Sequence, residues 1–73
     1  MSRRRRLRTY SVTLSDGGTA QYATRRTITH AVELRAADGS ARVHSWHETV
    51  WSARREANTR AYLGAAAAVL PVQ

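Results

Sequence analysis

The chain has 73 residues and no cysteine, which leaves room for one small domain and excludes disulfides and cysteine-ligated zinc sites. Twelve basic residues, all arginine, stand against five acidic residues, so the formal net charge is +7. No run of about 20 apolar residues could span a bilayer, and no apolar segment of a signal peptide follows the first arginines. We therefore expect a cytoplasmic protein with no membrane partner.

An arginine-rich segment opens the chain, with Arg3, Arg4, Arg5 and Arg6 in a row and Arg8 close behind. These like charges repel and bury nothing, which predicts a flexible basic arm over residues 1–6 and one folded domain over 7–73. Residues 9–73 keep 12 − 5 = 7 arginines and five acids, a net of +2. Most of the positive charge therefore belongs to the N-terminal segment.

Four segments with alternating or β-branched residues predict strands. Ser15-Asp16-Gly17-Gly18 is typical of a turn between the first two, and Ala37-Asp38-Gly39-Ser40 is typical of a hairpin turn between the last two. The predicted strands are residues 7–14, 19–24, 27–35 and 41–45.

A helix is predicted from Ser52 to Val69, because Ala, Arg, Glu and Leu dominate and the first proline is Pro71. Its N-cap stays open among Ser45, Thr49 and Ser52. The predicted fold class is α+β, an antiparallel sheet of three to four strands with one long C-terminal helix packed on one face. The bulky residues expected to support this packing are Val50, Trp51, Tyr62, Leu63 and Leu70.

Histidines are the only candidates for metal or acid–base chemistry. His44, His47 and Glu48 lie close in sequence, but the first is expected in a strand and the second at the helix entry. There is no HExxH, no Ser-His-Asp spacing and no phosphate-binding glycine loop. We expect a non-enzymatic protein with no catalytic residue, no metal and no cofactor.

Arginine-rich arms neutralise phosphates and release counterions, so the N-terminal segment favours a nucleic-acid partner. Arginine also binds carboxylates, so an acidic protein partner and a simple solubility segment stay open. The residues predicted to contact nucleic acid are Arg3, Arg4, Arg5, Arg6, Arg8, Arg25, Arg26, Arg35 and Arg42.

An apolar stretch closes the chain, from Leu63 to Val72. One sheet cannot cover every side of such a helix, so part of the surface is expected either to be exposed or to be covered by another chain, and a homodimer through this end is the second alternative. The expected partner or oligomer surface is Tyr62, Leu63, Val69 and Leu70. Trp46 and Trp51 are expected to pack at the junction of sheet and helix. The alternative is that one of them is exposed and acts as a stacking or protein-binding anchor, and the sequence leaves open which.

The Asp38-Gly39 turn and the helix segment Ser-Ala-Arg-Arg-Glu-Ala at 52–57 make residues 27–62 similar to the three-stranded DNA-binding modules of tyrosine-type integrases. That resemblance implies a sheet that reads the DNA major groove. Thr29–Val32 and Ser45–His47 resemble segments of small uncharacterised proteins of actinobacteria and their bacteriophages, which implies binding to a host protein.

Two functions therefore compete. The leading one is a nucleic-acid-binding module, with DNA as the expected ligand, that uses its Arg-rich arm. The alternative is a small phage-encoded factor that docks on a host protein, and modulates it, through its sheet face or its apolar end.

Overall fold

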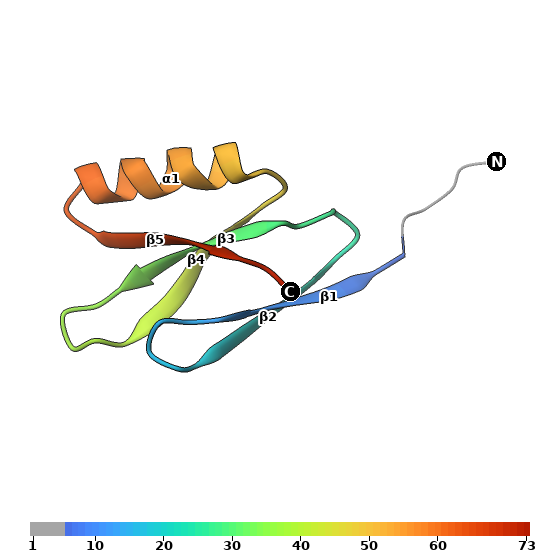
Figure 1. Ribbon diagram of the computed structural model, residues 1–73, viewed down its shortest axis with the longest axis horizontal. Helices are drawn as coiled ribbons and strands as arrows, with labels where there is room; N and C mark the ends of the chain where they lie inside the picture. The colour runs from blue at the N-terminus through green and yellow to red at the C-terminus, as the bar shows by residue number, and fades with distance from the viewer. Residues whose placement is uncertain (1–5) are drawn as a thin grey trace.

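The computed structural model describes residues 6–73, so Arg3, Arg4 and Arg5 of the predicted arm lie outside the described residues. Residues 6–73 form five strands and one helix (Figure 1). Their bounds are β1 Arg8–Thr13, β2 Thr19–Thr24, β3 His30–Arg35, β4 Ala41–His47, α1 Val50–Tyr62 and β5 Ala66–Pro71.

The strands form two antiparallel sheets. β1 and β2 make a two-stranded hairpin, and the second sheet has the order β4-β3-β5. β5 is antiparallel to β3, as β4 is, so β4, α1 and β5 form a crossover that passes over the central strand β3. The helix therefore lies between the last two strands in sequence and packs against the sheet that these strands help to form.

Three layers result, with α1 above the three-stranded sheet and the β1–β2 hairpin below it (Figure 1). On the helix side, Val32 from β3 and Ala53 and Ala57 from α1 form the buried core, with Leu34 and Val69 packed against it. Alanine at both helix positions lets the helix axis approach the sheet closely.

The hairpin side of the sheet is held by polar contacts as well as packing. Glu33, on β3, is 1% exposed and accepts hydrogen bonds from the backbone N–H of Ser15 (2.6 Å) and from its hydroxyl (2.7 Å). Asp16 accepts a hydrogen bond from the Ala41 N–H at 2.9 Å, which ties the first turn to the start of β4. The rings of Tyr22 and Trp46 stack with centroids 5.3 Å apart.

The predicted helix over Ser52–Val69 is wrong at its C-terminal end. Gly64 has φ +95°, the Gly64 N–H donates to Ala61 O (3.0 Å), and the Ala65 N–H donates to Arg60 O (2.9 Å). These two bonds form a Schellman motif, which ends the helix at a glycine because other residues are strained at positive φ. Residues 66–71 instead form β5, because the bare edge of β3 gives their backbone hydrogen bonds and their small side chains fit beneath α1.

The α+β class is confirmed, but the helix is not the last element, and five strands are present rather than three or four. Both predicted turns join paired strands. The N-cap is Thr49, whose hydroxyl accepts from the Ser52 N–H at 3.1 Å. Within residues 6–73, no helix is both long and apolar enough to cross a membrane.

Candidate nucleic-acid interface

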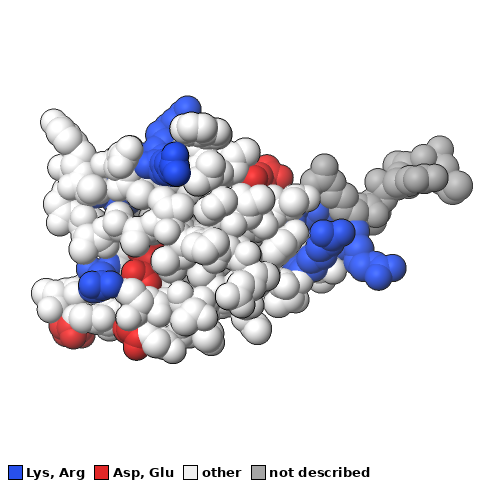
Figure 2. Space-filling view, viewed as in Figure 1, with Lys and Arg blue, Asp and Glu red and all other residues white. Residues whose placement is uncertain are grey.

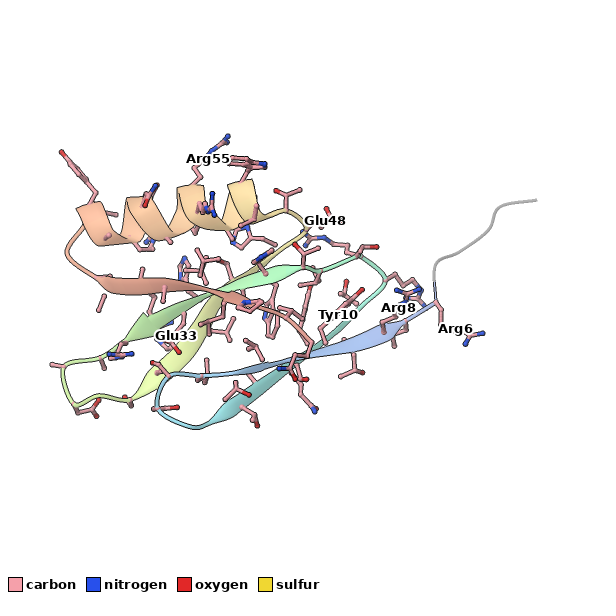
Figure 3. All side chains as sticks on the ribbon, in the orientation of Figure 1. Arg6, Arg8, Tyr10, Glu33, Glu48 and Arg55 are labelled. Atoms are coloured by element: carbon pink, nitrogen blue, oxygen red, sulfur yellow. The ribbon has the colours of Figure 1, made fainter. Side chains whose placement is uncertain are left out.

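Four of the predicted arginines gather at one end of the molecule. Arg8 begins β1 and is the register partner of Thr24, the last residue of β2. Antiparallel pairing therefore sets Arg6 and Arg8 beside Arg25 and Arg26, which follow β2 directly, and all four are exposed. We call Arg6, Arg8, Arg25 and Arg26 the basic end. Figure 3 shows Arg6 and Arg8 there, and Figure 2 shows basic side chains gathered at the same end of the molecule.

The corner that carries Arg25 and Arg26 is fixed by its backbone. The Arg26 N–H donates to Thr24 Oγ1 at 3.1 Å, and the Arg26 carbonyl accepts from the Tyr10 hydroxyl at 3.0 Å. Tyr10 lies opposite Tyr22 in the hairpin register, so the corner is braced by β1. A braced backbone presents two guanidinium groups at a constant separation, which reduces the entropy lost when they bind an anion.

Little negative charge opposes this basic end. Among residues 6–73, the only acid within ion-pair distance of these arginines is Glu48, whose Oε2 lies 3.7 Å from Arg26 Nη2. Both side chains are about half exposed, at 53% and 47%, so this pair is weak and water-screened. Arg6, Arg8 and Arg25 have no acidic neighbour within that distance in the described part of the chain.

Two acids lie in the turns at the opposite end of the two hairpins, toward the lower left of Figure 2. Hydrogen bonds from the backbone N–H groups of Gly18 and Ala41 hold the pKa of Asp16 below its ordinary value. Hydrogen bonds from the side chain and backbone of Ser40 do the same for the pKa of Asp38. Both groups remain negative near neutral pH, so the end of the strands that holds these turns carries acids as well as arginines, whereas the basic end has only Glu48 opposed to it among residues 6–73.

Arg35 and Arg42 do not join the basic end. Arg35 ends β3 and Arg42 lies near the start of β4, so both sit at the end of the sheet away from Arg26. They border a shallow hollow of about 260 Å³, and Arg35 Nε donates to Ser15 Oγ at 3.2 Å. The fold thus divides the predicted arginine set between two ends of the protein.

The outer face of α1 carries four exposed residues, two of which were expected to pack against the sheet. Trp51, Arg55, Asn58 and Tyr62 recur at four- and three-residue steps, so they share one side of the helix, and all are exposed. Trp51 is 71% and Tyr62 91% exposed, although both were expected to supply packing volume. Arg54 lies over the Trp51 indole, with Cζ 5.4 Å from the ring centroid.

This outcome answers which tryptophan is exposed. Trp46 is half buried against Tyr22, and Trp51 is the exposed one. The signal was the helix register: Ala53 and Ala57 mark the buried side, and Trp51 and Tyr62 are out of step with them.

The remaining residues of the expected partner surface are now in different elements. Leu63 is the helix C-cap and is 66% exposed. Val69 and Leu70 are half-buried residues of β5, where Val69 packs toward the helix-side core. Tyr62 and Leu63 therefore lie on the helix end, while Val69 and Leu70 belong to the sheet edge.

The histidines are engaged in local hydrogen bonds. His44 Nε2 lies 2.8 Å from Glu56 Oε2, which also accepts from Arg60 Nε at 2.9 Å. His47 bonds the hydroxyls of Ser45 and Ser52, both at 2.7 Å, and burial lowers its pKa. Within residues 6–73, no three His, Cys, Asp or Glu side chains gather as metal ligands.

No protein-family model, curated protein or solved structure matches this chain. The resemblances to integrase modules and to small phage proteins therefore stay predictions.

Proposed function

We propose that this protein binds nucleic acid, with duplex DNA as the expected ligand, through the basic end and the arginines that precede it. The observation that carries the proposal is the gathering of Arg6, Arg8, Arg25 and Arg26 at the point where Arg3, Arg4 and Arg5 join the domain. Seven arginines then act from one region, and each phosphate neutralised releases counterions.

The braced corner and the N-terminal segment have different roles in this proposal. Arg25 and Arg26 sit on a fixed backbone, so they set the position of the protein on a phosphate backbone. The consecutive arginines add contacts that carry no sequence information. Because the described groups recognise phosphate rather than base edges, we expect weak sequence preference from this surface.

Fluorescence anisotropy with a labelled duplex tests the proposal at low salt. We expect the protein to bind, and we expect both deletion of residues 1–6 and the variant R8A/R25A to weaken binding. The matched control is R35A/R42A, which removes the same charge from the other end of the sheet and should change affinity far less. Absence of binding at low salt, or equal losses from both double variants, would contradict the proposal.

A second candidate function is docking on an acidic surface of a host protein. It is favoured by the outer face of α1, where two aromatic side chains are largely exposed beside Arg54 and Arg55. Tryptophan, tyrosine and arginine are the residues most enriched at the centres of protein interfaces. A nuclease-resistant one-to-one complex, lost in W51A/R55A and kept in R8A/R25A, would support this candidate over nucleic-acid binding.

A further inference from the structure

β5 is an edge strand with little of the usual protection, since only Pro71, its last residue, lacks an N–H on the outward side. In the order β4-β3-β5, one side of β5 pairs with β3, and within residues 6–73 no strand pairs with the other side of Ala66–Pro71; β1 reaches that side only at Gln73, where Ser11 bonds it. The six residues Ala66–Pro71 carry no charge, and their register with β3 is continuous. A regular, uncharged, apolar edge is the kind to which another strand adds.

The opposite edge, β4, is protected in two ways. Val32 pairs with Ser45 and Glu33 with Val43, so the intervening His44 forms a bulge in β4. The Ala41 N–H is bound by Asp16 at 2.9 Å. The contrast indicates that β5 is the edge of this sheet left open for pairing.

The hydrogen-bond alternation tells which groups of β5 point outward. The Val72 N–H donates to Thr29 O at 3.0 Å, which makes the neighbouring register pair, His30 and Pro71, a non-hydrogen-bonded pair. In an antiparallel ladder bonded and non-bonded pairs alternate, so Ala68 and Leu70 bond to β3, while Ala67 and Val69 direct their backbone groups away from it. Pro71 has the same outward position, where its missing N–H removes no bond to β3.

We propose that β5 pairs antiparallel with β5 of a second copy of this chain, with Ala68 opposite Ala68 of that copy. In this register Ala67 of each copy lies opposite Val69 of the other, so both N–H and C=O groups of all four residues are bonded. If one β5 strand shifted by one residue along the other, outward backbone N–H and C=O groups of one copy would lie opposite inward ones of the other, and these hydrogen bonds could not form. Further along the chain, Gln73 already bonds Ser11 in both directions (3.2 and 2.9 Å), which confines the pairing to Ala66–Leu70.

The net charge of the chain and the number of strands in its sheet favour a second copy of this chain as the partner that pairs with β5. Two chains that each carry +7 repel, so they can meet only along an uncharged strip, and β5 is such a strip. Figure 2 shows mostly uncharged atoms across the middle of the face where β5 runs in Figure 1. An acidic partner would gain nothing from this strip. Pairing turns a three-stranded sheet into one of six strands, the usual size in globular proteins.

One consequence rests on the proposed function. Antiparallel pairing across a two-fold axis turns the ends of the two β5 strands in opposite directions. The two basic ends would then lie at opposite extremes of the dimer, which would bind two segments of nucleic acid.

A single engineered cysteine tests the dimer without any nucleic acid. Ala68 would face its counterpart in a non-hydrogen-bonded pair, with Cα atoms about 4.5 Å apart, within the disulfide range. The chain has no native cysteine, so the background is clean. We expect A68C to form a covalent dimer under mild oxidation, while the control N58C, on the exposed face of α1, stays mostly monomeric. Equal yields from both variants would overturn the proposal.

Two further measurements keep the test decisive. Light scattering of the wild-type protein at millimolar concentration should give twice the chain mass of 8.1 kDa, and A67P, which removes an outward N–H, should return it to the monomer. If A67P does not fold, amide exchange of the wild type decides. The Ala67 and Val69 amides should exchange more slowly as concentration rises. A wild-type mass of one chain, or exchange at these amides independent of concentration, would refute the pairing.

Discussion

Replacing Glu33 by alanine is expected to destabilise this protein more than any other change of a charged residue in the described domain. Its carboxylate is 1% exposed and holds Ser15 by two short hydrogen bonds, which fix the first hairpin against the central strand. The E33A variant leaves the Ser15 N–H without its acceptor and opens a cavity beside β3. Hydrogen bonds to a charged group contribute about 1.5–3 kcal/mol, while burial of the charge opposes them.

We therefore expect a net loss of about 2–4 kcal/mol in the free energy of unfolding. A chain of this size has a total stability of roughly 4–11 kcal/mol, so the loss is a large fraction of it. Urea unfolding followed by circular dichroism measures the change, and the thermal midpoint should fall by at least about 10 °C.

The matched control is E48A, which removes a half-exposed carboxylate 3.7 Å from Arg26 and should cost less than about 1 kcal/mol. The reasoning is refuted if E33A costs under about 0.5 kcal/mol, or no more than E48A.

Three further predictions concern the helix and its contacts. G64A should cost about 1 kcal/mol in urea unfolding because it places a side chain at φ +95°; an unchanged midpoint would contradict the assigned helix end. T49A should cost about 1 kcal/mol by losing the N-cap bond to the Ser52 N–H, and an unchanged urea midpoint would contradict this cap. The thermal midpoint should fall on acidification in two stages. Burial lowers the pKa of His47, so the contribution of this histidine to the free energy of unfolding declines as pH drops below about 6.5. The hydrogen bond from His44 lowers the pKa of Glu56, so the contribution of this carboxylate to the free energy of unfolding declines below about pH 4.5. A midpoint that is flat or rises between pH 7.5 and 4 would disprove this sign.

The sign of the pH effect follows from linkage. For both groups the folded-state pKa lies below the unfolded one, so the unfolded chain binds more protons as pH falls. Stability is fully present above the ordinary pKa of each group and is lost as pH falls through the folded-state pKa.

Local signals were enough to predict the first four strands and their turns. Asp38-Gly39 and Asp16-Gly17-Gly18 specify tight turns, and the alternation of β-branched and polar residues around them marks the strands. The strand of residues 66–71 was missed because alanine favours a helix locally, and only the open edge of β3 makes it a strand. Gly64 was the available signal: a glycine fourteen residues after the helix start, with Val69 and Pro71 further on, is typical of a helix end.

The burial of Glu33 also could not be predicted from the local sequence. Alternation along the strand places Glu33 on its polar side, which an antiparallel sheet often leaves to solvent, but the β1–β2 hairpin covers that side. Which face a second hairpin covers depends on contacts between distant segments, such as Ser15 with Glu33, and not on local pattern.

The candidate site could be predicted only in part, because its arrangement also depends on which distant segments pair with one another. Arg25 and Arg26 were predicted to contact nucleic acid together with Arg8, and the register of β1 with β2 brings Arg8 beside them. The placement of Arg35 and Arg42 at the other end depends on the direction of β3, which the arginine positions alone do not reveal.

The salt dependence of duplex binding tests the central claim most directly. The logarithm of the binding constant should fall linearly with the logarithm of salt concentration, with a slope of about −0.9 per neutralised phosphate. The variant R8A/R25A should make the slope shallower by about 2, while R35A/R42A leaves it unchanged. A slope near zero for the wild type, or the same slope for wild type and R8A/R25A, would contradict nucleic-acid binding through the basic end.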